Sequence, residues 1–313
     1  MMPARRSFLL GGLALLAGCS SGGYDGPERT LTIAAGEEGG FYLAFAKLLA
    51  EQINRAEPRL HCTALPTEAS RANLELVRTT RADLALVLAD SALTALAGNP
   101  PFATQVPLRA LGRVYENYMQ LMVRADSPIH SVADLADRTV SFGAPGSGAA
   151  LFGDRLLDVT GLHPRVEHLQ LADAVAGLAG GRLDALLWSG GVPTPALAEL
   201  DSRVGIRLLP LDDVMAKLRA AFGPVYESVQ VPSGAYRLVG GFRTIGVANL
   251  LVCSPTLPDD VAGAVVSVLV RQATDLVPQP AVGTQFLDAR SLIGTWGLPL
   301  HPGAAATYRE LHG

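Results

Sequence analysis

Ile33-Ala-Ala-Gly36-Glu-Glu-Gly39 and Val140-Ser-Phe-Gly143-Ala-Pro-Gly146 lie far apart in the chain and share the same spacing of glycines. Each stretch follows the start of an apolar run and precedes a run with helical spacing, which is the pattern of a strand, a tight loop and a helix. Downstream, Arg81-Ala-Asp83-Leu-Ala-Leu86 parallels Arg182-Leu-Asp184-Ala-Leu-Leu187, and both enter an apolar strand. The paired motifs predict that one half of the chain repeats the architecture of the other.

Strands and helices are expected to alternate around both glycine stretches. Short apolar runs predict strands at Leu31–Ala35, Leu60–Leu65, Leu84–Leu88, Thr139–Phe142 and Ala185–Trp188. Between them, apolar residues at helical spacing predict helices at 41–57, Ser70–Thr80, Gly148–Thr160 and Leu171–Gly180. Ser70 is expected to be the N-cap of its helix. This alternation predicts an α/β fold with a parallel sheet and crossover helices.

The N-terminal segment carries an export pattern. Arg5 and Arg6 precede an apolar run that is too short to span a bilayer, and the run ends in Leu16-Ala-Gly-Cys19. The pattern resembles a bacterial lipoprotein signal, and the two arginines also resemble a twin-arginine signal. We expect a signal peptide at 1–19, lipidation at Cys19 and a flexible Gly- and Ser-rich stalk at 20–30. The alternatives are an uncleaved membrane tether and Sec export.

Composition and charge restrict the partners. The chain is 49% hydrophobic and 17% charged, which is typical of a globular protein, and its net charge of −4 argues against a nucleic-acid partner. Cys62 and Cys253 both lie in apolar runs. A disulfide between them and two buried free thiols are both compatible with an oxidising compartment.

The two glycine stretches predict a binding site. A loop between the carboxyl end of a strand and a helix N-terminus exposes backbone N–H groups that align with the helix dipole. Two such loops facing each other across a cleft are expected to hold an acidic solute at the edge of an open parallel sheet. The alternative is that the glycines only form tight turns.

An ordered set of short motifs covers nearly all of the chain after the expected signal: Leu31-Thr-Ile-Ala-Ala-Gly36, Gly39-Gly40-Phe-Tyr42, Ser70 with Asn73, Ala82-Asp83-Leu with Asp90, Arg124-Ala-Asp-Ser-Pro-Ile129, Ser141-Phe-Gly143-Ala-Pro-Gly146-Ser147-Gly148, Gly190-Gly191-Val-Pro193 and His301-Pro-Gly303. In this set the chain resembles the TAXI family of periplasmic solute-binding proteins, which serve TRAP-type secondary transporters. The resemblance implies a type II periplasmic-binding-protein fold. It also implies hinge strands near Tyr115–Val123 and Val247–Cys253, one lobe of 31–118 plus 240–313, and a second lobe of 119–239.

The same resemblance implies a function and a site. The ligand would be a small carboxylate such as glutamate or 2-oxoglutarate, and the partner the membrane subunit of a TRAP transporter; a sensing subunit for a receptor kinase is the alternative. We expect a monomer in the periplasm, anchored to the membrane by lipid, without a cofactor or metal. The expected ligand-binding residues are Gly39, Gly40, Tyr42, Ser70, Asn73, Asp90, Gly146, Ser147, Gly148, Trp188, Gly190 and Gly191. Core packing is the alternative role of Tyr42 and Trp188.

The chain departs from the family pattern in its first loop. Glu37 and Glu38 stand where glycines are usual, and Glu68-Ala69 replaces a pair of glycines. If these carboxylates line the pocket, the ligand carries an amine or only one carboxylate, or the solute is larger and less polar. If they face solvent, they only complement a helix N-terminus.

Catalytic motifs are absent from the sequence. Gly143–Gly148 has the outer spacing of a P-loop, but Ala149 and Ala150 follow it in place of the Lys and Ser/Thr that contact phosphate and magnesium. There is no G-x-S-x-G elbow and no H-E-x-x-H pair. The sequence therefore predicts a binding protein, with an enzyme that uses Glu37 and Glu68 as a more distant alternative.

Overall fold

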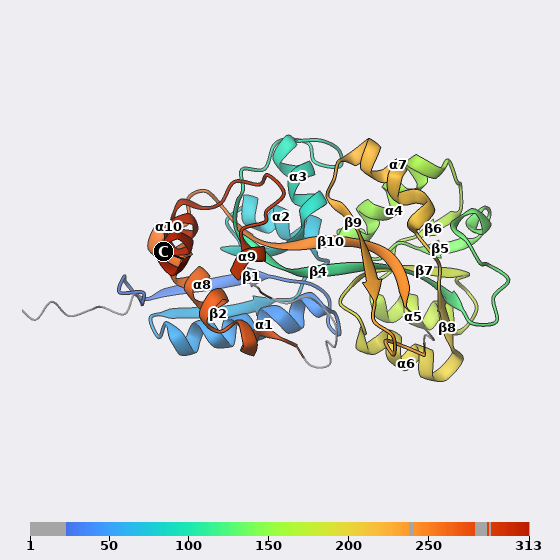
Figure 1. Cartoon of the computed structure of the whole chain (residues 1–313), viewed down its shortest axis with the longest axis horizontal. Coiled ribbons are helices and arrows are strands. Elements are labelled where there is room, and N and C mark those ends of the chain that lie inside the picture. Colours follow the sequence, from blue (N-terminus) through green and yellow to red (C-terminus); the bar gives the residue numbers. More distant parts are fainter. Residues whose placement is uncertain (1–22, 238–240, 279–286, 288, 313) are drawn as a thin grey trace, which may run out of the picture.

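The computed structural model of the chain (Figure 1) describes residues 23–237, 241–278, 287 and 289–312. The expected signal peptide at 1–19, with Cys19, lies outside these residues. Strand β1 (Arg29–Ala34) begins within the expected stalk, because its first residues already pair with β2 (Leu60–Leu65). The backbone N–H of Tyr24 also donates to Glu57 Oε2 at 2.7 Å. Residues before Leu31 thus already belong to the folded part of the chain, whereas the sequence pattern placed the start of the first lobe at Leu31.

One mixed sheet runs through the whole molecule, with the strand order β2-β1-β3-β10-β4-β7-β5-β6. Its two central strands are β4 (Arg109–Arg124) and β10 (Phe242–Cys253), which pair antiparallel. The other strands are β3 (Leu84–Leu88), β5 (Thr139–Ser141), β6 (Arg165–Glu167), β7 (Ala185–Gly190), β8 (Ile206–Leu208), which pairs with β4, and β9 (Tyr226–Val231), which pairs with β10.

Helices cover both faces of the sheet (Figure 1). They are α1 (Phe41–Ala56), α2 (Ser70–Arg78), α3 (Ala89–Ala97), α4 (Gly148–Thr160), α5 (Leu171–Ala179), α6 (Pro195–Val204), α7 (Asp212–Phe222), α8 (Asp259–Arg271), α9 (Ala289–Leu292) and α10 (Pro302–His312), with 3₁₀ turns at Val132–Leu135 and Ala273–Leu276. Within the described residues, no helix has the length and apolar character needed to cross a membrane.

The molecule has an α/β fold with two lobes, which share the central strands. We use "first half" for β1–β3 with α1–α3 and α8–α10, and "second half" for β5–β9 with α4–α7. Figure 1 shows β4 and β10 passing from one half into the other. The hinge strands expected near Tyr115–Val123 and Val247–Cys253 are parts of these two strands. The exact boundaries of the two lobes, at 118/119 and 239/240, stay a prediction.

The internal repeat predicted from the glycine stretches is confirmed. Parallel strands lie in the order β2-β1-β3 in the first half and β6-β5-β7 in the second. The paired aspartates also play the same part in both halves. Asp83 Oδ2 accepts from the Thr32 N–H at 2.9 Å, and Asp184 Oδ2 accepts from the Thr139 N–H at 2.8 Å. Each aspartate thus ties the loop before its strand to the neighbouring strand.

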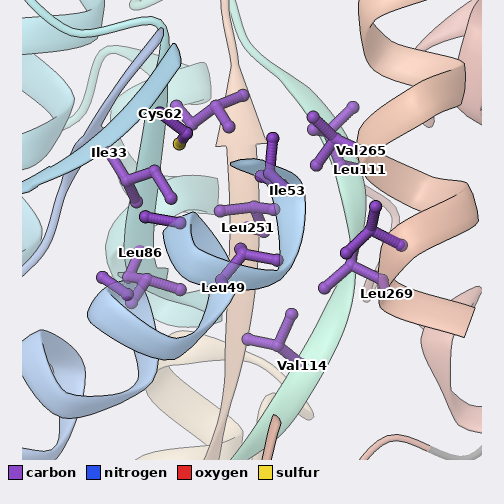
Figure 2. Close-up of a cluster of buried hydrophobic side chains, with 14 of the residues drawn as sticks. Ile33, Leu49, Ile53, Cys62, Leu86, Leu111, Val114, Leu251, Val265 and Leu269 are labelled. Atoms are coloured by element: carbon purple, nitrogen blue, oxygen red, sulfur yellow. The ribbon is translucent and has the colours of Figure 1, made fainter. Parts of the chain in front are cut away.

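Burial of apolar side chains holds helix α1 on the sheet. Figure 2 shows Leu49 and Ile53 of α1 against Leu251 of β10, with Val265 and Leu269 of α8 alongside. All five are fully buried or nearly so. Complete burial of each such side chain contributes about 1.5–3 kcal/mol, so this cluster is a major source of stability in the first half.

Cys62 and Cys253 lie in the same core as free cysteines. Burial raises the pKa of both thiols to about 12. Of the two alternatives left open by the sequence, the structure has the buried free thiols.

Helix α2 begins differently from the prediction. Its N-cap is Ala69, with φ of 77° and ψ of −144°, and not Ser70. Ser70 is the first helical residue, and its Oγ accepts from the Leu88 N–H at 3.1 Å instead. The backbone conformation of Ala69 is one that almost only glycine adopts, and it costs a residue with a Cβ about 1–3 kcal/mol. Ala69 stands where the related pattern has glycine, so this strain is a consequence of the substitution.

Candidate functional site

A cavity of about 30 Å³ lies between the two halves. This volume corresponds to about two water molecules. Both halves and β4 contribute to its wall: Gly36, Glu37, Gly40, Phe41, Tyr42, Ala69, Ser70 and Leu88 from the first half, Asn117 from β4, and Ser147, Gly148, Ala149, Trp188 and Ser189 from the second. A solute that touches this wall therefore touches both halves at once.

Three helices begin at the cavity wall. The first residues of α1, α2 and α4 are Phe41, Ser70 and Gly148, and all three line the cavity. The N–H groups of a first helical turn have no acceptor within the helix, and the helix dipole places partial positive charge there. Some of these N–H groups already have acceptors: those of Arg71 and Ala72 donate to the Gly146 carbonyl, and that of Ala150 donates to Ser147 Oγ. The helix dipoles and the remaining N–H groups make this part of the wall a favourable place for an anionic group.

The second glycine stretch allows the halves to approach closely. A Cβ on Gly148 would lie 2.4 Å from Leu88 Cδ1 and 3.0 Å from Ser70 Oγ, both of which belong to the other half. Next to it, Ser147 is the N-cap of α4, and its Oγ accepts from the Ala150 N–H at 3.1 Å. Glycine at 148 is thus required for the contact that closes the cavity.

Tyr42 and Ser70 form a pair of hydroxyls at the cavity, 3.4 Å apart. Burial raises the pKa of Tyr42 above its usual range, so the phenol stays neutral. Ser70 Oγ already accepts from Leu88 N–H, and only one hydroxyl hydrogen is used between the two side chains. The other hydrogen of the pair is left as a donor.

Asn117 brings an amide from the middle of β4 to the cavity. It is 1% exposed, and its Nδ2 donates to Ser189 Oγ at 3.0 Å. Its Oδ1 has no hydrogen-bond partner among the residues that the structure describes. The sequence analysis missed this residue; the available signal was an uncharged polar side chain within an otherwise mostly apolar hinge strand.

Glu37 is the acidic residue of the first loop that lines the cavity. Its Oε2 accepts from the Leu171 N–H of α5, in the opposite half, at 2.7 Å. Burial raises the pKa of its carboxyl; the bond from Leu171 lowers it and the nearby Glu68 raises it further. Glu38 instead is exposed and 3.5 Å from Lys47 Nζ, and Glu68 is exposed as well. The solvent-facing alternative therefore holds for Glu38 and Glu68.

A model of one protein family matches residues 33–311, and the family is described as NMT1-like. The chain belongs to the NMT1-like family. Solved structures share its fold at low identity. A structure described as a periplasmic transporter is 12% identical, covers 91% of this chain and 93% of its own, and has a TM-score of 0.55.

Two further structures show how widely this fold occurs. The alkanesulfonate-binding protein SsuA from Xanthomonas axonopodis pv. citri, bound to MOPS, is 18% identical over 91% of this chain and 84% of its own, with a TM-score of 0.50. The effector-binding domain of QuiR in complex with shikimate is 11% identical over 78% and 97%, also with a TM-score of 0.50. The NMT1-like chain therefore has the fold of periplasmic binding proteins.

The predicted ligand residues of this NMT1-like protein fall into two groups. Those that line the cavity are Gly40, Tyr42, Ser70, Ser147, Gly148 and Trp188. Those that do not are Gly39, Asn73, Asp90, Gly146, Gly190 and Gly191; Gly39 borders a neighbouring groove with Lys47 and Pro193. The role of either group in binding stays a prediction. Leu88 and Phe41 join Asn117 as lining residues outside the predicted set.

Asn73 is occupied by structural hydrogen bonds. Its Nδ2 donates to the carbonyls of Ala35 and Leu86 at 2.5 and 2.7 Å, and its Oδ1 accepts from Thr67. It therefore joins α2 to the end of β1 and the middle of β3, and its amide hydrogens are used within the protein.

Asp90 is occupied by a buried ion pair between the halves. Its Oδ2 lies 3.2 Å from Arg155 Nη1 and accepts from the Tyr226 hydroxyl at 3.0 Å. Arg155 also donates to Tyr226 at 2.8 Å and to Thr94 Oγ1 at 2.6 Å. We name Asp90, Thr94, Arg155 and Tyr226 the ion-pair contact.

The remaining glycines act through their backbone carbonyls. Gly146 accepts from the N–H groups of Arg71 and Ala72 across the halves, at 2.9 and 3.3 Å. Gly190 and Gly191 accept from Gln120 Nε2 at 3.3 and 3.4 Å.

Proposed function

We propose that this NMT1-like protein is an extracytoplasmic solute-binding protein, which captures one small solute between its halves and does not transform it. The observation that carries this proposal is the composition of the cavity wall. It combines residues of both halves, three helix N-termini and the unpartnered Oδ1 of Asn117. Unsatisfied buried donors and acceptors are costly, and a matching solute supplies their partners.

The chemistry of the wall supports binding over catalysis. Among the described residues, Glu37 is the one carboxyl group of the lining, which includes no His, Cys, Lys or Arg. General acid–base or nucleophilic catalysis uses a titratable group together with a base or orienting partner. Glu68, the second acid of the enzyme alternative, is exposed and outside the lining.

The size of the cavity supports a closing motion. Because the wall comes from both halves and the room is small, we expect a solute to enter as the halves move apart. The connections β4 and β10 are continuous strands, so bending within them is the expected hinge motion.

The biological setting follows from the sequence patterns. We infer a periplasmic protein, anchored by lipid at Cys19, that delivers an organic acid or an amino acid to a TRAP-type transporter, as the TAXI resemblance implies. A receptor kinase is the alternative partner, since the closed form would present the same paired surfaces to either partner.

A thermal unfolding screen of the full chain in detergent tests the proposal. The panel contains dicarboxylates, 2-oxo acids, amino acids, amines and aromatic acids. A true ligand at 100 times its Kd is expected to add about 2.7 kcal/mol to the unfolding free energy, which raises the Tm by a few degrees. A panel without any stabilising solute, or conversion of a bound solute to a product, would contradict the proposal.

A further inference from the structure

We propose that the solute is a small α-amino acid with an uncharged side chain, whose ammonium group is held by Glu37 and Asn117 and whose carboxylate lies at the helix N-termini. This inference rests on the proposed function and narrows its ligand class.

Two acceptors in the wall call for a positively charged donor. Asn117 Oδ1 is buried without a partner, which costs about 1–3 kcal/mol unless a ligand donates to it. Glu37 receives one N–H from Leu171, and within the described part of the chain no Lys, Arg or His forms an ion pair with it. An ammonium group carries three N–H donors and a positive charge, and both residues line the same cavity, so one ammonium group has a donor for each of them.

The donors of the wall call for a carboxylate. The first N–H groups of α4 have no acceptor within the helix, apart from that of Ala150, which Ser147 satisfies. The surplus hydrogen of the Tyr42–Ser70 pair adds a hydroxyl donor. An anionic oxygen at these donors forms charge-assisted hydrogen bonds, which are stronger than neutral ones.

Charge balance excludes a second carboxylate. No cationic side chain lines the wall in the part of the chain that the structure describes, and Glu37 already contributes a carboxyl group. The second carboxylate of glutamate or 2-oxoglutarate would lie in the same small cavity as Glu37 without a cation to compensate it. A zwitterion has a positive ammonium group for the acceptors of the wall and a negative carboxylate for its N–H and O–H donors.

The apolar part of the wall limits the side chain of the solute. Phe41, Leu88 and Trp188 enclose a cavity of about 30 Å³, so any occupant larger than two waters holds the halves slightly further apart. A short, uncharged side chain requires the least separation. The expected order of affinity is therefore alanine and serine above longer amino acids.

Calorimetric titration of the full chain provides the first test. Alanine and lactate differ only by the exchange of ammonium for hydroxyl, so they isolate the ammonium contact. We expect lactate, glutamate and 2-oxoglutarate to bind about tenfold or more weakly than alanine, the loss of one charge-assisted hydrogen bond. Tighter binding of a dicarboxylate or of lactate would overturn the amino-acid inference and leave the solute-binding function intact.

A matched pair of variants provides the second test. Glu37→Gln keeps an oxygen for the Leu171 N–H and removes the charge, whereas Glu38→Gln changes an exposed carboxylate near Lys47. We expect Glu37→Gln to weaken alanine about tenfold to a hundredfold, while lactate binding does not weaken and Glu38→Gln changes neither. An equal loss for alanine and lactate would assign Glu37 a structural role only. Absence of binding by every solute in the wild-type protein would instead contradict the proposed function.

Discussion

The two halves touch at two buried places that differ in how completely their polar groups are paired. In the ion-pair contact, Asp90 meets Arg155 and Tyr226, and Arg155 reaches Thr94, so each charged group has a partner. In the cavity, Asn117 Oδ1 lacks a partner among the described residues, and the N-termini of α1, α2 and α4 are only partly capped. The saturated contact is suited to holding the halves in register. At the unsaturated contact, a solute gains binding free energy by pairing with the donors and acceptors that lack partners.

Breaking the ion-pair contact gives the largest expected effect. Arg155→Met leaves the Asp90 side chain, which is 0% exposed, without its cation and also removes the guanidinium from above the Phe222 ring, 4.6 Å away. Removal of one partner from a buried pair costs about 3–5 kcal/mol. We expect a fall of this size in the unfolding free energy, measured by chemical denaturation.

An exposed pair supplies the control for this variant. Arg182 and Glu167 form an ion pair with side chains 51% and 35% exposed, so Arg182→Met is expected to cost less than about 1 kcal/mol. Adding Asp90→Asn to Arg155→Met removes the unpaired charge and should recover part of the lost stability. Similar losses of unfolding free energy in Arg155→Met and Arg182→Met would show that the buried ion pair contributes no more to stability than the exposed one.

Glu116 sharpens the comparison because it is the neighbour of Asn117 and lies outside the cavity lining. It is 4% exposed and 2.6 Å from Arg113, and burial raises the pKa of its carboxyl from 4.5 to about 7 against the opposing effect of Arg113. The folded protein therefore binds this proton more tightly than the unfolded chain does. As the pH rises from about 4.5 to about 7, the unfolding free energy is expected to fall by up to about 3 kcal/mol.

Denaturation curves between pH 4.5 and 8 measure this slope. Glu116→Gln has no proton to lose and is expected to flatten it. Glu75→Gln is the matched control, since Glu75 also pairs with an arginine three residues away but is exposed. A slope that is unchanged in Glu116→Gln would assign the pH dependence to other groups.

The smallest expected effect concerns the unsaturated contact alone. Gly148→Ala introduces a Cβ where Leu88 Cδ1 lies 2.4 Å away, so the halves are held slightly apart. Overpacking of this kind costs about 1–3 kcal/mol, which corresponds to a loss of solute affinity of about 5- to 150-fold if the whole cost falls on the closed, solute-bound form. Calorimetric titration with the best solute of the screen measures it. Gly180→Ala is the control, because Gly180 has a φ of −83° at an exposed helix end, and this variant should bind the solute normally. An equal loss of affinity in both variants would contradict the explanation that the new Cβ at position 148 holds the halves apart.

Local patterns in the sequence predicted much of the fold. The strands Leu60–Leu65 and Leu84–Leu88 and the helix Gly148–Thr160 have the predicted bounds. Local apolar spacing determines all three, and Gly161 ends the helix. The repeat was also detectable, since Asp83 and Asp184 make the same bond in each half.

The candidate site was only partly predictable, because its closure joins residues remote in sequence. Arg155 is 65 residues from Asp90, and no periodicity connects them. Asn117 reaches the cavity only because β4 crosses between the halves. Asn73 looked like a ligand residue because its type fits either role, and only the neighbouring carbonyls reveal that its amide is occupied.

The C-terminal helices α8–α10 pack into the first half, whose strands β1–β3 come from the N-terminal part of the chain. Leu300 bridges to Ala110, and the Tyr308 hydroxyl donates to the Leu111 carbonyl at 2.8 Å, so α8–α10 close the core around strands made much earlier in synthesis. The Tyr308 hydroxyl and the carbonyl that it contacts are 197 residues apart in the chain. Contacts this distant in sequence slow folding. Until α8 has been made, the part of the apolar face of α1 that packs on Val265 and Leu269 is uncovered, and exposed apolar surface of this kind favours aggregation.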